Sequence, residues 1–166
     1  RQRQMCIRDR YICGYARAML KAGFLYSTSE EHEAFIAFKS SKESLGIGAA
    51  SELIKAVIRT MRFRDMIKLV KLAKKGGESY EDSLKKAKKP YVFVGMLVVR
   101  RKYQGQGYMR KVLDIAYEEG KKLGCPVLLD TDAALKRDKY VHLGMKNVRT
   151  RKFDEGIVLY DLAKED

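Results

Sequence analysis

The feature that most constrains the fold is a nine-residue apolar run at residues 91–99 (YVFVGMLVV), directly after Pro90. A run of this length without polar alternation is typical of a strand that is buried on both faces of a sheet. Gly95 interrupts the run and indicates a β-bulge or a close backbone approach. A basic, glycine-bearing turn at residues 100–107 follows, and then an amphipathic helix that ends near Leu123. The chain therefore contains a buried strand that leads through a turn into a helix.

The other segments alternate between helical and strand patterns. The spacing predicts helices over residues 11–22, 49–73, 79–88 and 133–143, the second of them bent or divided near residues 62–65. Strand patterns predict a hairpin at residues 24–28 and 34–38, a buried strand at 127–130, and a second hairpin at 148–153 and 157–162. This order predicts an α/β fold with a mixed sheet and a helical insertion before the central strand.

The composition is that of a globular protein with a strong positive charge. Hydrophobic residues make up 46% of the chain, so it can bury a core and is not disordered by composition. The formal net charge of +14 favours anionic partners, whether nucleic acid, a membrane surface or a phosphorylated cofactor. Residues 59–89 carry eleven Lys and Arg against four acidic residues, which a solvated helix face also explains. No aromatic-rich nucleic-acid motif accompanies them, so we do not expect nucleic acid as the partner.

The lack of a targeting signal in the sequence and the scattered cysteines indicate the compartment. No apolar run approaches the length of a membrane span, and none near the start resembles a secretory signal. Cys6, Cys13 and Cys125 are odd in number and lack the spacing of a disulfide framework or a zinc site. We therefore expect a cytoplasmic protein without a metal.

The turn after the central strand carries the most informative motif. Residues 103–109 (YQGQGYM) place two glycines between a strand end and a helix start, where backbone N–H groups gather at the positive end of a helix dipole. Such a turn binds phosphate, and the alternative is a tight turn that needs glycine for its geometry alone. The residues exclude a P-loop, which requires Gly-Lys-Ser/Thr. They also exclude the dinucleotide fingerprint, because Arg110 stands where its third glycine is required.

Two motifs resemble the GCN5-related N-acetyltransferase (GNAT) superfamily. Gln104-x-x-Gly107-x-Met109 is similar to the family's pyrophosphate-binding motif, Gln/Arg-x-x-Gly-x-Gly/Ala, with Met109 in place of the usual small residue. Residues 140–145 (YVHLGM) are similar to its Tyr-x-x-x-Gly-Phe signature. The resemblance covers about residues 91–162. It implies an acyl-CoA N-acyltransferase-like fold, with a mostly antiparallel central sheet flanked by helices, and acetyl-CoA as cosubstrate.

The resemblance also implies roles for individual residues. Acetyl-CoA would be held along the central strand and the turn, by Leu97, Val98, Val99, Gln104, Gly105, Gln106, Gly107, Tyr108, Met109 and Arg110. Tyr140 would be the general acid that protonates the leaving thiolate, because the pKa of a phenol is not far above that of a thiol. The alternative for Tyr140 is a tyrosine that packs on the sheet. Gly95 stands where many members have an acidic residue, so the general base stays open between a water chain, Glu31 and Glu33.

These observations predict an acetyl-CoA-dependent N-acetyltransferase that moves an acetyl group directly to a primary amine of a small molecule or peptide. A basic protein that binds CoA, nucleic acid or a membrane surface without catalysis is the alternative. We interpret residues 1–10 (RQRQMCIRDR) as a non-native leader, because they show neither helical nor strand periodicity. Residues 11–166 are then a single N-acetyltransferase domain that lacks its native first strand.

Overall fold

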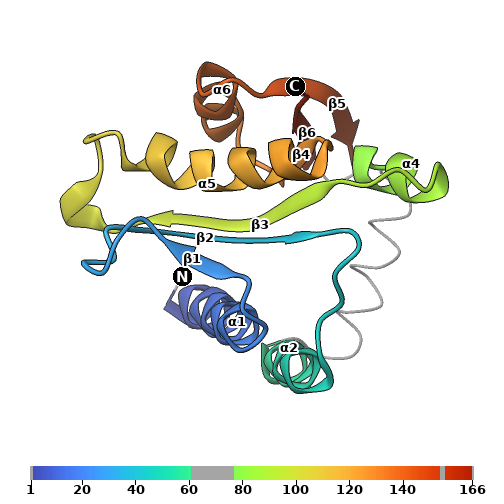
Figure 1. The fold of residues 1–166 in the computed structure, drawn as a ribbon. Helices are drawn as coiled ribbons and strands as arrows, with labels where there is room; N and C mark the ends of the chain where they lie inside the picture. The colour runs from blue at the N-terminus through green and yellow to red at the C-terminus, as the bar shows by residue number, and fades with distance from the viewer. Residues whose placement is uncertain (1, 61–76, 154–155, 166) are drawn as a thin grey trace. The chain divides into compact units, whose positions relative to one another are not determined.

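The computed structural model describes residues 2–60, 77–153 and 156–165. The chain divides into two compact units. The first comprises residues 1–25 and 44–73, and the second comprises residues 26–43 and 74–166. The second unit contains all the residues that the sequence motifs single out, and Figure 1 gives the labels of its elements.

Two helices form the described part of the first unit. α1 spans Gln2–Lys21 and α2 spans Ile47–Thr60. They pack closely, since a Cβ placed on Gly14 would collide with the Cβ of Ala56. The helix predicted from residue 11 thus begins earlier, inside the segment interpreted as a non-native leader, and that interpretation stays a prediction. Residues 61–73 of the second predicted helix lie outside the described residues.

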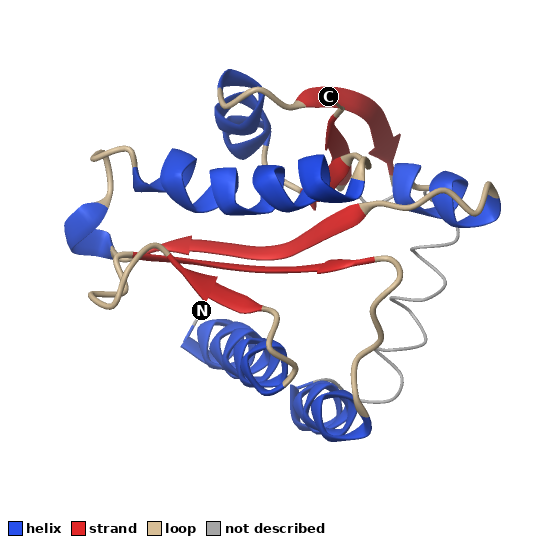
Figure 2. Ribbon diagram, viewed as in Figure 1, coloured by secondary structure: helices blue, strands red, loops and turns tan. Residues whose placement is uncertain are grey.

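The chain forms a six-stranded sheet in the order β1-β2-β3-β4-β6-β5. Figure 2 shows the strands in red. The strands are β1 (Leu25–Ser27), β2 (Ala34–Ser40), β3 (Val92–Val99), β4 (Val127–Thr131), β5 (Lys146–Lys152) and β6 (Val158–Lys164). β3 and β4 run parallel, whereas the β2–β3, β4–β6 and β5–β6 pairs are antiparallel. The predicted mixed, mostly antiparallel sheet flanked by helices is therefore confirmed.

The core lies between one face of the sheet and α5 (Tyr108–Leu123). Val92 and Val94 of β3 share a buried cluster with Val112 and Leu113 of α5, which Figure 1 shows running along β3. α6 (Ala134–His142) lies on the same face and, with the residue that follows it, adds Tyr140 and Leu143 to the cluster. The amphipathic spacing that predicted α5 therefore reflects its packing on the central strand.

α4 (Tyr80–Lys86) covers the opposite face of the sheet. Side chains alternate in direction along a strand, so the residues between those of the main core point toward α4. Leu84 of α4 packs with Tyr91 and Leu128, and Phe93 borders this smaller cluster. α4 begins with a capping box, in which the Ser79 Oγ accepts from the Asp82 N–H at 3.0 Å and the Ser79 N–H donates to the Asp82 carboxylate at 3.3 Å. The helix predicted at residues 79–88 is thus present and slightly shorter.

Gly95 forms the β-bulge that the sequence predicted. On β2, Ala37 pairs with Met96 and Phe38 pairs with Val94, which leaves Gly95 without a partner. An extra residue of this kind shifts the alternation of backbone direction by one position beyond it. The bulge therefore determines whether the backbone N–H and C=O groups of the last residues of β3 point toward β2 or away from it.

Candidate active site

The turn that joins β3 to α5 adopts the geometry that its two glycines allow. A short 3₁₀ turn, Arg101–Tyr103, follows β3, and α5 begins at Tyr108 with Gly107 as its N-cap. Gly105 and Gly107 have φ angles of 79° and 80°, in the left-handed region that side-chain-bearing residues rarely adopt. Glycine is thus required here by backbone geometry, and this requirement is compatible with a binding role.

Five consecutive N–H groups of this turn form no short, well-aligned hydrogen bond with any described residue. The Gln104 N–H donates to the Arg101 carbonyl at 3.3 Å, and the Arg110 N–H donates to the Gly107 carbonyl at 3.1 Å. The N–H groups of residues 105–109 find no such partner. They lie at the N-terminus of a 16-residue helix, whose dipole favours an anion at this position. The sequence predicted amide donors from Gln104 to Arg110, and the two outermost amides are used within the protein.

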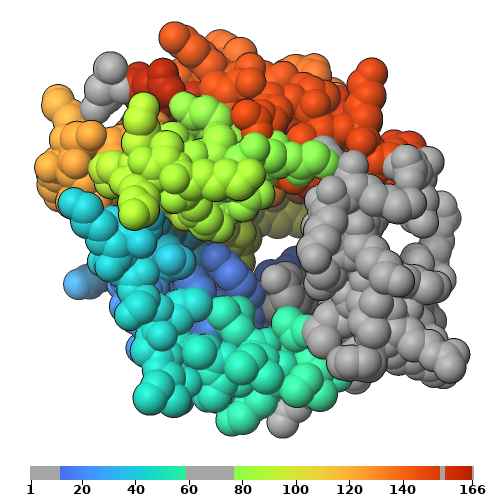
Figure 3. Space-filling view, turned by 90° about the vertical axis from the view of Figure 1, so that its right-hand side faces the viewer, coloured from blue at the N-terminus to red at the C-terminus, as the bar shows by residue number. Residues whose placement is uncertain are grey.

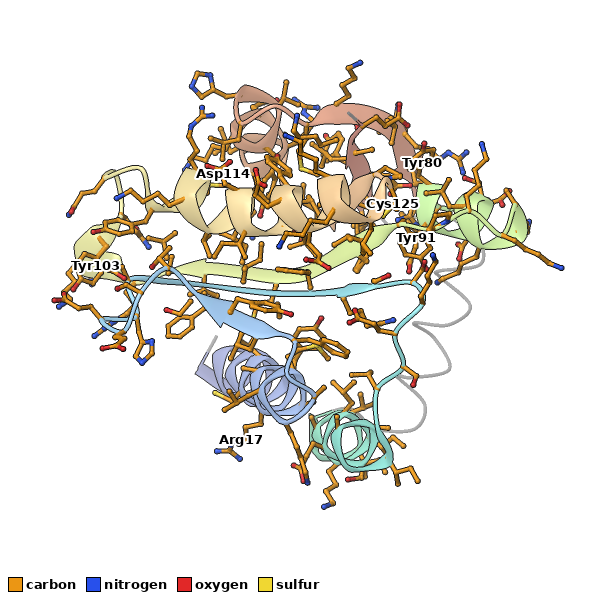
Figure 4. All side chains as sticks on the ribbon, in the orientation of Figure 1. Arg17, Tyr80, Tyr91, Tyr103, Asp114 and Cys125 are labelled. Atoms are coloured by element: carbon orange, nitrogen blue, oxygen red, sulfur yellow. The ribbon has the colours of Figure 1, made fainter. Side chains whose placement is uncertain are left out.

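The side chains of the turn brace it and surround it with positive charge. The Gln104 side chain donates to the Val99 carbonyl at 3.2 Å, and the Gln106 side chain donates to the Lys102 carbonyl at 2.9 Å. The Tyr103 ring, labelled in Figure 4, lies 5.3 Å from the Tyr108 ring. Four exposed cations form no ion pair within the described part of the chain: Arg101, Lys102, Arg110 and Lys111.

One edge of β3 is open beside this turn. β2 pairs with β3 along its length, but β4 pairs with it only at Val92–Val127 and Phe93–Leu128. The two parallel strands diverge beyond this point, so the last six residues of β3 have no strand on the β4 side within the described residues. This is the strand splaying that the family resemblance implied.

The direction of the backbone groups follows from one hydrogen bond. The Arg100 N–H donates to the Glu33 carbonyl on the β2 side at 2.9 Å. Because successive residues of a strand alternate in direction, the backbone groups of Leu97 and Val99 face the open edge. Those of Val98 face β2, so of the three strand residues implied by the resemblance only two offer backbone groups to a ligand.

Tyr140 lies on α6 and packs against the core. It is half-buried, and burial raises the pKa of its phenol. Its hydroxyl takes part in none of the hydrogen bonds among the described residues. By contrast, the Tyr117 hydroxyl donates to the Leu143 carbonyl at 3.2 Å. Tyr140 is therefore a protonated phenol with an unused donor, as a general acid requires.

A cavity of about 160 Å³ lies on the α4 face, where β3 and β4 diverge. Phe93 and Leu128, the last residues to pair between these strands, line it, and the first turn of α4 closes one side. Tyr80 in Figure 4 marks this turn. Figure 3 shows the α4 segment, in green, against the orange and red surface of the last strands.

The polar wall of this cavity is a small network of charged groups. Arg151 donates to Asp161 from Nε at 3.0 Å and from Nη2 at 2.8 Å, and this Nη2 lies 3.6 Å from a carboxylate oxygen of Asp130. Asp161 also accepts from the Tyr80 N–H at 2.8 Å. Asp130 lies farther from Arg151 than Asp161 does, and 48% of its side chain is exposed. Desolvation raises its pKa, against the opposing effect of Arg151.

Sequence reasoning missed Asp130 as a candidate site residue. The signal that could have found it is its place directly after the last apolar residue of a buried strand. This strand runs parallel to β3, which leads into residues 100–107, named the phosphate turn because the sequence predicts that this turn binds phosphate. Of the two candidate bases on the β1–β2 turn, Glu33 is buried and accepts from the Ser29 and Thr28 hydroxyls at 2.6 and 2.8 Å. These bonds, that of Ser29 first, lower its pKa to about 2. A carboxylate with so low a pKa accepts protons poorly.

The chain's two histidines are both exposed. His32 is exposed, with its ring over Phe35 at 5.5 Å, and His142 is exposed at the end of α6. Burial raises the pKa of the Cys125 thiol. No group of three metal-ligating side chains converges within the described ranges. None of the helices described is long and apolar enough to cross a membrane.

Comparison with known proteins gives one family match. Residues 73–143 match the Acetyltransferase (GNAT) family, and this segment includes β3, the phosphate turn, α5 and β4. No curated protein matches the sequence. A putative acetyltransferase from Agrobacterium tumefaciens is 27% identical over 46% of this chain and 57% of its own, with a TM-score of 0.41. The chain thus spans little more than half of that protein's length.

Two solved structures align over most of the chain. Arylalkylamine N-acetyltransferase 2 from Aedes aegypti has a TM-score of 0.58 and 14% identity, and covers 90% of this chain and 76% of its own. Polyamine N acetyltransferase from Drosophila melanogaster has a TM-score of 0.55 and 10% identity, with 92% and 79% covered. At these identities the likeness is one of fold. Together with the family match it confirms the predicted resemblance: the chain has the GNAT acetyltransferase fold, and its residues 73–143 match the model of that family.

Proposed function

We propose that this protein is an acetyl-CoA-dependent N-acetyltransferase that moves the acetyl group directly to a primary amine of a small molecule or peptide. The observation that carries the proposal is the row of five N–H groups at residues 105–109, which form no well-aligned hydrogen bond within the described part of the chain and lie next to the open edge of β3. A ligand that uses both features needs a diphosphate at one end and an extended arm with amide groups along its length. Acetyl-CoA has both.

The binding roles follow from the direction of each group. The N–H groups of residues 105–109 hold the pyrophosphate, with the exposed Lys102 and Arg110 adding positive charge nearby. The backbone groups of Leu97 and Val99 pair with the pantetheine arm as a neighbouring strand would. The Gln104 side chain already occupies the Val99 carbonyl, so Val99 contributes its N–H. The thioester then points along β3 toward the junction with β4.

The chemistry requires two proton transfers. The acceptor amine loses a proton and attacks the thioester carbonyl, so that a C–N bond forms and the C–S bond breaks. We assign the first transfer to Asp130, because its carboxylate borders the junction cavity and its raised pKa makes it a better base than an ordinary aspartate. We assign the second to Tyr140, whose phenol gives its proton to the leaving sulfur. Burial raises the pKa of this phenol, and it also raises the pKa of a thiol beside it. The two pKa values therefore stay close, so the proton can pass from the phenol to the thiolate.

The test separates binding from catalysis. Gly107→Asp places a carboxylate against the proposed pyrophosphate position, while Gly107→Asn has nearly the same shape and the same tolerance of a left-handed backbone. We expect calorimetry to show acetyl-CoA binding to the parent protein, much weaker binding to the Asp variant, and intermediate binding to the Asn variant. Equal affinities for the two variants would contradict a diphosphate at this turn.

Activity is measured as CoA release with a panel of primary amines. Release that depends on the amine supports the acetyltransferase. Binding of acetyl-CoA without acetylation of any amine in the panel would overturn the catalytic part of the proposal and favour a CoA-binding protein without transferase activity.

A further inference from the structure

A second concave site lies near the start of β3, at the end away from the phosphate turn. It is a groove of about 450 Å³ between the end of β2, with the turn that follows it, and the connection from α4 to β3. Five of its eight lining residues are lysines and none is acidic: Lys39, Lys42, Lys85, Lys88 and Lys89. β3 has eight residues, so this groove lies about 25 Å along the strand from the phosphate turn.

Most of this charge is not neutralised within the protein. Lys85 pairs with Glu81 at 3.0 Å and with Asp82 at 4.0 Å. Among the described residues, Lys39 donates to a backbone carbonyl, that of Glu43, at 3.4 Å and forms no ion pair. The remaining three lysines form no ion pair with any described residue. Like charges gathered in one concave site repel one another, so an anion that enters is favoured by all of them.

The two walls of the groove are held in place by backbone hydrogen bonds. The Ser41 N–H donates to the Tyr91 carbonyl at 2.8 Å, and the Tyr91 N–H donates to the Ser41 hydroxyl at 3.2 Å. On the opposite wall, Lys88 has a left-handed backbone (φ 53°), which is uncommon for a residue with a Cβ. The Lys89 N–H donates to the Leu84 carbonyl at 3.0 Å, just beyond the end of α4. The backbone positions from which the lysines project are therefore fixed.

The lining indicates what kind of anion fits. Single-stranded nucleic acid is bound through stacking on aromatic rings, but Tyr91 is only 5% exposed and its hydroxyl donates to Glu81 at 2.9 Å. A membrane surface is bound through exposed apolar side chains, and the lining has no exposed large apolar residue. The volume is that of a site for a small molecule. We propose that this groove binds a compact small molecule that carries several phosphate groups, at a site separate from that of acetyl-CoA.

Calorimetric titration of the full chain with inorganic tripolyphosphate tests this proposal. Lys88→Glu/Lys89→Glu reverses two charges on one wall, and Lys42→Glu reverses one on the other wall, in case the double variant does not fold. Lys121→Glu/Lys122→Glu is the matched control, because it reverses two adjacent exposed lysines at the end of α5. We expect each groove variant to weaken binding by about tenfold or more, and the control by less than about threefold.

Three outcomes would overturn the proposal. An equal loss in the Lys121/Lys122 control would mean that tripolyphosphate responds to the overall charge of the protein. Loss in Gly107→Asp but not in the groove variants would place the ligand at the phosphate turn. Binding of phosphoinositide vesicles or an oligonucleotide, sensitive to Lys88→Glu/Lys89→Glu while tripolyphosphate does not bind, would replace the small molecule by a lipid surface or a nucleic acid. The titration with tripolyphosphate does not depend on acetyl-CoA binding. The proposed function and the proposed phosphate site in the groove can therefore be disproved independently.

Discussion

At the scale of single residues, Tyr140 and Tyr117 differ in what their hydroxyls do. The Tyr140 hydroxyl donates to no described residue, whereas the Tyr117 hydroxyl donates to the Leu143 carbonyl. We expect Tyr140→Phe to lower kcat by about 10²- to 10⁴-fold, the usual contribution of a general acid, with little change in acetyl-CoA affinity. Tyr117→Phe makes the same chemical change but should cost only about 1 kcal/mol of stability, with kcat nearly unchanged. Equal kcat losses in both variants would remove Tyr140 from the mechanism.

Glu33 makes a residue-scale prediction about pH. Its pKa is about 2 in the folded protein and about 4.3 when unfolded, so its hydrogen bonds to Ser29 and Thr28 stabilise the fold above pH 4.3. This stabilisation is lost as the pH falls toward 2. In Glu33→Gln the side chain no longer titrates, so we expect the stability gap between parent and variant to shrink between about pH 5 and pH 2.5 in urea unfolding. A gap that stays constant with pH would mean that Glu33 is not held ionised.

Single residues also show which parts of the site sequence can reveal. The phosphate turn depends on a few adjacent residues, and its glycines are needed for backbone angles that sequence alone indicates. The charged network of the junction cavity joins Asp130, Arg151 and Asp161, which come from three strands. No local pattern connects such residues, so Asp130 could be recognised only once the strands were placed side by side.

At the scale of elements, α4 is a seven-residue helix that depends on its first turn. So short a helix is marginal by itself, and the capping box of Ser79 and Asp82 supplies partners for N–H groups that would otherwise be unpaired. We expect Ser79→Ala to lower the free energy of unfolding by about 1 kcal/mol. Ser83→Ala, which removes only a bond to the Tyr80 carbonyl within the helix, is the matched control. An equal loss of stability in both variants would show that the cap is not what stabilises α4.

Element types were largely predictable, because apolar periodicity reflects burial. The central strand, the bulge at Gly95 and α5 follow the sequence pattern closely. The bounds differ by a few residues where backbone pairing carries a strand beyond its apolar residues, as at β5 and β6. The divergence of β3 from β4 could be expected only through the family resemblance, since it depends on how two strands separated by a whole helix approach each other.

At the scale of the whole molecule, strand order and surface charge were beyond sequence reasoning. The predicted hairpin pairs β5 with β6, but no local pattern indicates that β6 rather than β5 lies beside β4. The same holds for the lysine groove, which unites residues near position 40 with residues near position 88. The sequence showed a basic segment at residues 59–89, and the fold shows that part of its charge joins lysines from β2 and the turn after it.

The open edge of β3 has a further consequence for the empty protein. A row of unpaired strand groups is a template on which another polypeptide can add a strand, and globular proteins normally protect such edges. Here the edge cannot be blocked permanently if it is to receive an extended ligand. Occupancy by that ligand and β-augmentation by a second chain would compete for the same groups, so the bound protein would resist aggregation better than the empty one.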